Sequence, residues 1–195
     1  MRTDAEMPIN ATQIPIALRR EFTTLEFARA EFPMLTTWGV RDESVSVHSL
    51  GFNYLAALGR HLGFWAATEF PIRVGNTFIR PDFVWWSKED RQVKLIGEFE
   101  RFESGQQAKL VEKARNLLLS YESLDHAPAA MVLVPWTLAG TELAGNSAAR
   151  AVAYDGFRNQ NGKMIAGVGR DATFVLAHAI FGRSEECVRL LEVKL

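Results

Sequence analysis

Glu98 and Glu100 lie two positions apart in a largely apolar stretch, residues 93–102, whose composition predicts a β-strand. Because side chains alternate along a strand, both carboxylates are expected on one face, with Leu95 and Phe99 on the other. Two like charges at this spacing repel each other, and an ionised buried carboxylate costs several kcal/mol unless a cation or hydrogen bonds offset it. The pattern therefore predicts a compensating cation beside this pair.

Asp82 is a third carboxylate that can reach the same place. It interrupts an apolar segment, residues 79–86, and an acid in such a predicted strand is unexpected without a partner. The residues between Asp82 and Glu98 include a polar loop at 87–92, so the two strands can pair. Carboxylate oxygens at this density suit Mg²⁺ or Mn²⁺, and the backbone carbonyl of Phe99 would lie beside them as a neutral ligand.

Spacing alone leaves two other interpretations of these carboxylates open. Arg80 or Arg101 could supply the compensating charge in place of a metal ion. A Glu-x-Glu pair on the surface also protects edge strands against aggregation, and Pro81 is compatible with an edge or a strand start for Asp82.

The elements around the carboxylates are expected in the order helix, three-strand meander, helix, strand. A helix beginning near Ser44 or Ser46 and stopping at Gly63 precedes the meander, and Ser104-Gly105 can cap a long helix after it. Gly75-Asn76 is a hairpin signal, and a right-handed crossover would place the last strand parallel to the third. The expected strands are 64–74, 77–86, 93–102 and 129–134.

This order predicts a single α/β domain over residues 1–195, built on a mixed sheet flanked by helices, with its core at about 44–136. The N-terminal arm, 1–43, is expected to be extended or helical at first, and Thr23-Thr24-Leu25-Glu26 resembles a capping box that opens a short helix. The C-terminal additions, 137–195, are expected to hold a helix within 138–154, a strand near 173–179 and a closing helix from Ser184 that carries Cys187.

The residues and the order of elements together resemble the PD-(D/E)xK nuclease superfamily, which has a restriction-endonuclease-like core. The resemblance is carried by Pro81-Asp82 and by Glu98-Phe99-Glu100 on the next strand, and it covers roughly residues 44–136. It implies a hydrolase that cleaves phosphodiester bonds of DNA with Mg²⁺, as an endonuclease or exonuclease. It also implies that Asp82 and Glu98 are metal ligands, with the metal activating the attacking water.

The sequence departs from that family at one position, where Glu100 stands in place of the usual Lys. Glu100 could act as a base or as a further metal ligand, or Lys109 or Lys113 on the following helix could supply the missing positive charge. The resemblance also implies an acid on a preceding element, for which Glu43 and Glu69 are the candidates. The alternative is a catalytically inactive nuclease-fold protein that acts in nucleic-acid binding or assembly.

Composition places limits on the partners. The net charge of −1 is unlike that of proteins that depend on non-specific phosphate contacts, although a local groove could still be positive. No apolar run is long enough to span a membrane and residues 1–10 lack a signal-peptide pattern, so we expect a cytoplasmic protein. DNA is the expected partner, and a homodimer would supply two active sites for cutting both strands.

The histidines and the aromatic residues offer no equally strong alternative to this hypothesis. The four histidines, among them His48, show no spacing typical of a metal site. The aromatic residues Trp65, Phe83, Trp85 and Trp86 are expected mostly in the core, although one exposed Trp could stack on a base of a single-stranded nucleic acid. A glycoside hydrolase is a poor fit, because its carboxylates must flank an open sugar groove.

Overall fold

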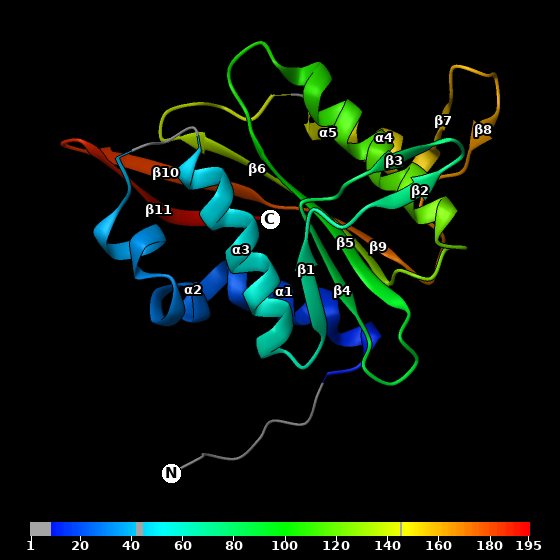
Figure 1. Ribbon diagram of the computed structural model, residues 1–195. Helices are drawn as coiled ribbons and strands as arrows, with labels where there is room; N and C mark the ends of the chain where they lie inside the picture. Colours follow the sequence, from blue (N-terminus) through cyan, green and yellow to red (C-terminus); the bar gives the residue numbers. More distant parts are fainter. Residues whose placement is uncertain (1–8, 42–44, 145) are drawn as a thin grey trace.

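A curled, mixed β-sheet forms the centre of the computed structural model, which describes residues 9–41, 45–144 and 146–195 (Figure 1). In these residues the main sheet has seven strands in the order β1-β4-β5-β6-β10-β11, with β9 also pairing with β6. Helices cover both faces, which confirms the α/β class. The strands are β1 (Trp65–Thr68), β4 (Phe83–Trp86), β5 (Val93–Arg101), β6 (Ala130–Leu138), β9 (Thr173–Leu176), β10 (His178–Ser184) and β11 (Cys187–Lys194).

The strand directions follow the predicted topology. β1, β4 and β5 form an antiparallel meander, and β6 lies parallel to β5. β9 and β10 both run parallel to β6, β9 along its first half and β10 along its last three residues, and β11 then turns back antiparallel to β10. Since β6 is flanked on both sides, its apolar residues are buried almost without interruption, as parallel strands require.

One face of the sheet is covered by α3 (Ser46–His61) together with α1 (Ile14–Thr24). α3 approaches the sheet closely because two of its buried positions are glycines. A Cβ atom at Gly51 would lie 2.1 Å from the Phe99 ring, and one at Gly59 would lie 2.6 Å from the Trp85 ring. The helix stops where it was predicted to, at Gly63, whose φ of 95° ends helical geometry.

The opposite face is covered by α4 (Gln107–Ser123) and α5 (Asn146–Asp155). The apolar side of α4, which includes Leu110, Ala114 and Leu117, is fully buried against Ile96 of β5 and Met131 of β6. Each fully buried Leu contributes about 1.5–3 kcal/mol of transfer free energy. This packing fixes the rotation of α4, so the polar side chains next to its apolar side lie at fixed places above β5. Among the described residues, no helix is long and apolar enough to cross a membrane.

The predicted capping box at Thr23–Glu26 is wrong. α1 continues through Thr24, Leu25 adopts a left-handed conformation with φ of 51°, and α2 (Glu26–Glu31) starts immediately afterwards. The buried carboxylate of Glu21 caps α2, because it accepts hydrogen bonds from the backbone N–H of Phe27 at 3.0 Å and of Ala28 at 2.9 Å. The Tyr54 hydroxyl donates a third bond to it at 2.8 Å. A carboxylate from the preceding helix therefore caps α2 in the way that the motif suggested for a threonine.

The predicted first two strands are interrupted by an inserted hairpin. Gly75-Asn76 does form a turn, but it joins the short strands β2 (Ile72–Val74) and β3 (Thr77–Ile79), which make a separate two-stranded sheet. The physical reason is the pair of prolines, Pro71 and Pro81, that bracket the hairpin, because proline lacks the N–H that a continuous sheet strand must donate. The long strands 64–74 and 77–86 are thereby cut to β1 and β4.

The predicted closing helix from Ser184 is also wrong, since Cys187 begins strand β11. Val188 and Leu190 are buried while Arg189 and Leu191 are not, which is the alternation of a strand rather than of a helix. The predicted helix within 138–154 is found as α5, which begins later because β6 extends to Leu138. The remaining elements are η1 (Ala11–Gln13), η2 (Met34–Trp38) and the hairpin β7 (Phe157–Arg158) with β8 (Met164–Ile165).

Candidate metal and catalytic site

The three predicted carboxylates come together at one end of the meander. Glu98 and Glu100 project from β5 toward α4, whereas Leu95 and Phe99 pack in the core on the α3 side, which confirms the predicted alternation. Asp82 lies immediately before β4, next to β5. All three residues are buried, with relative exposures of 8% for Asp82, 1% for Glu98 and 9% for Glu100.

Asp82 is held by the backbone of β5. Its Oδ2 accepts a hydrogen bond of 2.7 Å from the N–H of Phe99, just beyond the last β4–β5 residue pair, Phe83 and Gly97. In an extended strand the N–H and C=O of one residue point to the same edge, so the Phe99 carbonyl lies on the edge where Asp82 sits. The sequence-predicted ligand pair, Asp82 and the Phe99 carbonyl, is therefore adjacent in the structure.

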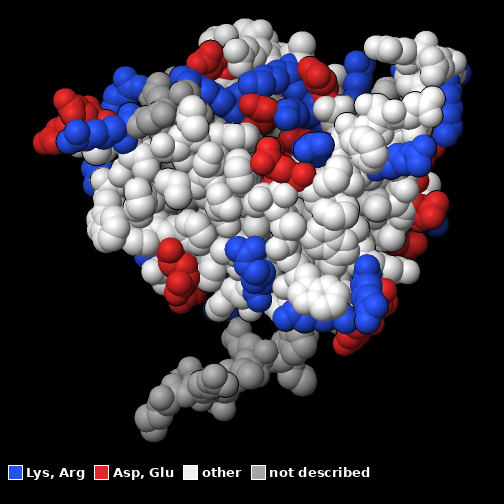
Figure 2. All heavy atoms as spheres, viewed as in Figure 1, with Lys and Arg blue, Asp and Glu red and all other residues white. Residues whose placement is uncertain are grey.

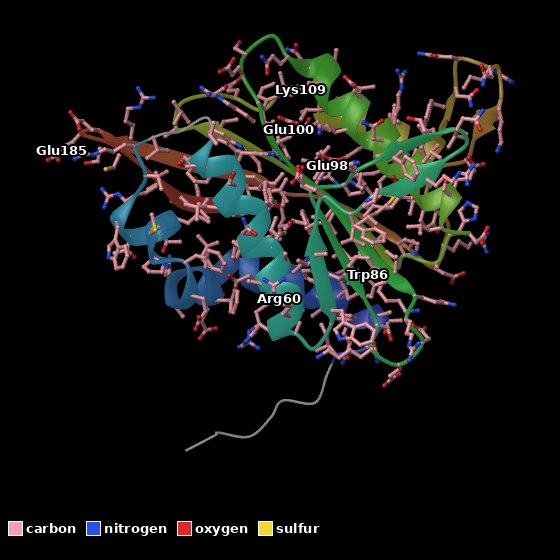
Figure 3. The ribbon with its side chains drawn as sticks, viewed as in Figure 1. Arg60, Trp86, Glu98, Glu100, Lys109 and Glu185 are labelled. Atoms are coloured by element: carbon pink, nitrogen blue, oxygen red, sulfur yellow. The ribbon has the colours of Figure 1, made fainter. Side chains whose placement is uncertain are left out.

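Two lysines of α4 face the carboxylates, and Figure 3 labels one of them, Lys109, close to Glu100. Lys113 Nζ lies 2.8 Å from Glu98 Oε2 and 3.1 Å from Glu100 Oε2, and Lys109 Nζ lies 2.7 Å from Glu100 Oε1. Residues four apart share one face of a helix, which explains why both lysines reach β5. Lys109 Nζ also donates to the carbonyl of Arg101 at 3.2 Å.

The compensating charge thus comes from α4 rather than from the arginines that the sequence suggested. Arg80 is exposed at the end of the inserted hairpin. Arg101 pairs with Glu103 at 2.9 Å, and its guanidinium lies 5.4 Å from the centre of the Trp136 ring. Figure 2 shows the acidic and basic groups meeting in one small area of this face.

The lysines do not neutralise the site completely. Burial, and next the negative charge of Asp82, raise the pKa of Glu98 to about 8 in spite of Lys113. Burial also raises the pKa of Asp82, against the opposing pull of the Phe99 N–H and of His48. Glu100 is affected by burial too, but its bonds to Lys109 and Lys113 outweigh that effect and its pKa is lowered. The unbalanced negative charge lies between Asp82 and Glu98, where a bound cation would gain most.

His48 is a site residue that the sequence reasoning set aside. It lies in the first turn of α3, with its Nε2 3.8 Å from Asp82 Oδ1 and its ring edge-on to Phe52 at 5.3 Å between centroids. The spacing between histidines in the sequence could not reveal His48 as a site residue, because its partner is Asp82, which lies outside α3. A search for any metal-ligating residue type at the start of the preceding helix would have found it.

Of the two candidates for an additional acid, the structure describes only Glu69, and its side chain does not join the cluster. Glu43 lies outside the described residues. Glu69 follows β1 in a left-handed conformation with φ of 50°, where its backbone N–H donates to the carbonyl of Asp82 at 3.1 Å and its side chain is exposed. Glu69 therefore fixes the backbone of Asp82 and leaves the first turn of α3 to His48.

The donor types at the site fit a hard divalent cation. Asp82 and Glu98 offer carboxylate oxygens and Phe99 a carbonyl oxygen, which are the ligands of Mg²⁺ and Mn²⁺. Within residues 9–41, 45–144 and 146–195, no three His, Cys, Asp or Glu side chains are grouped closely enough to enclose a metal ion by themselves. A metal ion here would accordingly need the Phe99 carbonyl, water or substrate oxygens to complete its coordination.

No protein-family model, curated protein or solved structure matches this chain. What the site can do is consequently inferred from its own geometry and charges.

Proposed function

We propose that the protein is a Mg²⁺- or Mn²⁺-dependent nuclease that hydrolyses phosphodiester bonds of DNA, with a restriction-endonuclease-like core formed by α3, β1, β4, β5, α4 and β6. One observation carries this proposal. Asp82, immediately before β4, lies next to Glu98 of β5, with the ammonium group of Lys113 2.8 Å from Glu98. Two acids that can hold a divalent cation, next to a positively charged side chain, offer the groups that metal-assisted phosphodiester hydrolysis can use.

Each residue has a distinct role in this proposal. Asp82, Glu98 and the Phe99 carbonyl would hold the metal ion, with His48 beside Asp82. The metal ion, when bound, supplies Lewis-acid activation of the phosphate and lowers the pKa of the attacking water. Lys113 places a positive charge beside Glu98, where it can stabilise negative charge that develops on the phosphate oxygens. It takes the place of the lysine that the family motif would have at Glu100.

Glu100 and Lys109 act as positioning residues rather than as a base and a cation in contact with substrate. Glu100 is bound on both oxygens, by Lys109 and by Lys113, and its lowered pKa keeps it ionised. An acid held in this way is a poor proton acceptor at neutral pH, but it fixes the Lys113 ammonium group. Lys109 in turn ties Glu100 to the carbonyl of Arg101.

The alternative function, a catalytically inactive nuclease-fold protein, is favoured by the same ion pairs. Lys109 and Lys113 offset much of the charge of Glu98 and Glu100 with no metal ion, so the cluster could serve as a buried structural network. The two functions differ in their response to metal. A nuclease should be stabilised by Mn²⁺ through Asp82, whereas a structural network should not.

Plasmid nicking in Mn²⁺, together with the shift of the melting temperature on adding Mn²⁺, tests the proposal. Asp82→Asn should lose both nicking and the metal-dependent shift. Lys113→Met should keep the shift but reduce the nicking rate by about 100-fold or more, since one preorganised charge contributes roughly that much. Lys88→Met, an exposed lysine of the loop after β4, is the matched control and should behave as wild type. Nicking by Asp82→Asn at the wild-type rate would refute the assignment.

A further inference from the structure

The inserted hairpin β2–β3 carries an outward-facing pair of side chains next to the candidate site. Arg73 and Phe78 lie directly opposite each other across its two strands, and both are exposed, Phe78 to 59%. Arg73 is held in place by a hydrogen bond of 3.2 Å from its Nε to the carbonyl of Gly75 in the turn. The hairpin returns to the main sheet through Arg80 and Pro81, the two residues that precede Asp82.

The hairpin is anchored so that this pair must face outward. Ile72 is buried against the core under α4, so the alternate residue Arg73 points away from that core. A Phe exposed to this degree contributes little to folding, because its ring remains in water in the isolated chain. No Asp or Glu occurs from Phe70 to Pro81, whereas two arginines do. The hairpin segment, residues 70–81, is therefore apolar and positively charged. It ends directly before Asp82 of the acidic site.

Three further aromatic side chains lie beside the β1–β4 edge of the sheet, of which Trp65 and Phe70 are exposed and Trp86 is half-buried. Phe70 is 39% exposed and packs edge-on against Trp86, with ring centroids 4.8 Å apart. Trp86 is the cross-strand partner of Trp65, which is 49% exposed. We call Trp65, Phe70, Phe78 and Trp86 the aromatic strip.

Trp86 and its cross-strand partner Trp65 lie on the face of the sheet that carries Glu98. Trp85 points to the α3 side, where its Nε1 donates to the Leu55 carbonyl, so its neighbour Trp86 points to the α4 side, as Glu98 does. In Figure 3 Trp86 and Glu98 are seen on the same side of the molecule, with Arg60 near the lower end. Arg60 lies over β1, bonded to the Ala66 carbonyl at 3.1 Å. Figure 2 shows a broad uncharged surface below the charged area, with basic groups near its lower end.

We propose that the aromatic strip binds the unpaired bases of a single-stranded nucleic acid and directs its backbone to the carboxylates, which would make single strands or single-stranded ends the substrate class; this inference rests on the proposed nuclease function. Exposed aromatic rings in a row stack on successive bases of any sequence, and flanking arginines attract the phosphates. A duplex would hide its bases from the rings. Trp86 lies on the same face of the sheet as Glu98, and the hairpin that carries Phe78 leads directly into Asp82. The arginines beside these rings, Arg60, Arg73 and Arg80, match the negative charge of a nucleic-acid backbone.

Binding is measured without cleavage, by fluorescence anisotropy of a labelled oligothymidylate in EDTA, with a duplex of equal length for comparison. Wild type should bind the single strand more tightly than the duplex. Phe78→Ala and Trp65→Ala should each weaken binding to the single strand by roughly 5- to 100-fold, the loss expected for one stacked base. Since these side chains are exposed, the melting temperature should remain unchanged.

The second hairpin supplies a matched control. In β7–β8, Arg158 and Met164 are also cross-strand partners, Met164 is 50% exposed, and Arg158 Nη1 bonds the turn carbonyl of Gly162 at 2.9 Å. Arg73→Gln should weaken binding, while Arg158→Gln and Met164→Ala should not. Equal losses in both hairpins would overturn the proposal, because they would indicate a general electrostatic effect.

The remaining outcomes are equally decisive. Preference for the duplex, or unchanged binding by Phe78→Ala and Trp65→Ala, would overturn the aromatic strip while leaving the nuclease assignment in place. Selective loss of single-strand binding in a protein that does not cleave with Mn²⁺ would support the strip and count against the nuclease. If sedimentation shows a dimer that Trp65→Ala dissociates with DNA binding unaltered, the surface binds a second copy of the chain and the proposal is wrong.

Discussion

At the scale of single residues, the site combines two kinds of acid on one strand. Glu100 has a full complement of cationic partners, whereas Glu98 shares Lys113 with it and faces Asp82 as well. Neighbouring acids of the same type therefore differ in pKa, because Glu98 is the more deeply buried and has fewer cationic partners than Glu100. The less compensated one, Glu98, is the residue suited to bind a cation.

Glu98→Gln should raise the stability of the metal-free protein. The pKa of Glu98 is raised in the fold from 4.5 to about 8, so its ionised form opposes folding at pH values above the unfolded pKa, and this cost is fully present above pH 8. Replacing it with a neutral isostere should add roughly 1–3 kcal/mol to the free energy of unfolding, measured by urea in EDTA. The same variant should lose stabilisation by Mn²⁺. A loss of stability in EDTA would instead show that the ion pair with Lys113 stabilises the fold.

At the scale of elements, the distance of helix α3 from the sheet affects where Asp82 lies in the site. α3 lies so close to β5 that Gly51 touches the Phe99 ring, and the N–H of Phe99 holds Asp82. The depth of a helix on the opposite face thereby sets the position of a carboxylate in the site.

Gly51→Ala should disturb both packing and the site. Alanine normally favours an exposed helix position by up to about 1 kcal/mol over glycine, but here its Cβ would lie 2.1 Å from the Phe99 ring. Overpacking of this kind should lower the free energy of unfolding by about 1–3 kcal/mol and reduce cleavage through displacement of Phe99. Asn53→Ala, exposed on the same helix, is the control for changes in helix propensity. Wild-type stability of Gly51→Ala would show that α3 can move away from the sheet.

The elements also show how far the sequence could be interpreted. The alternation along β5 follows a period of two residues and is confirmed by the structure. The sequence left Lys109 and Lys113 as one alternative source of the missing positive charge, and the structure places both beside the carboxylates. The local pattern from Cys187 predicts a helix because it is ambiguous over so few residues, and only pairing with β10 identifies the segment as a strand. His48 was missed for a similar reason, since a single histidine gains meaning only when folding places Asp82 beside it.

At the scale of the whole molecule, the C-terminal segment completes the sheet. β10 continues the sheet beyond the end of β6, and His178 of β10 shares a hydrogen bond of 2.8 Å with Thr137 of β6. Burial, and next the positive charge of Lys194, lower the pKa of His178, while Glu192 opposes this. The fold therefore favours the neutral form of the His178 imidazole, which shares a hydrogen bond with Thr137 of β6.

Stability should depend on pH through His178. Because its pKa in the fold is below the unfolded value of 6.5, its contribution is fully present above pH 6.5 and is lost as the pH falls through the lowered pKa. Wild type should therefore lose more unfolding free energy than His178→Gln between pH 7.5 and pH 5, measured by urea denaturation. His126→Gln serves as a control for histidine titration elsewhere in the chain. Equal pH dependence of wild type and His178→Gln would exclude this role.

The arrangement of strands around β6 also has a consequence for synthesis. β6 is complete at Leu138, but its second neighbour, the β9–β10 segment, begins only at Thr173. After β6 has left the ribosome and until the β9–β10 segment has followed it, a long and almost wholly apolar strand presents an unpaired edge, which invites association with other nascent chains. Chaperone binding during translation should therefore be greatest after β6 has emerged from the ribosome and should end once Ser184 has done so. A chain cut short within that interval would aggregate, even though every residue of the acidic cluster is already present.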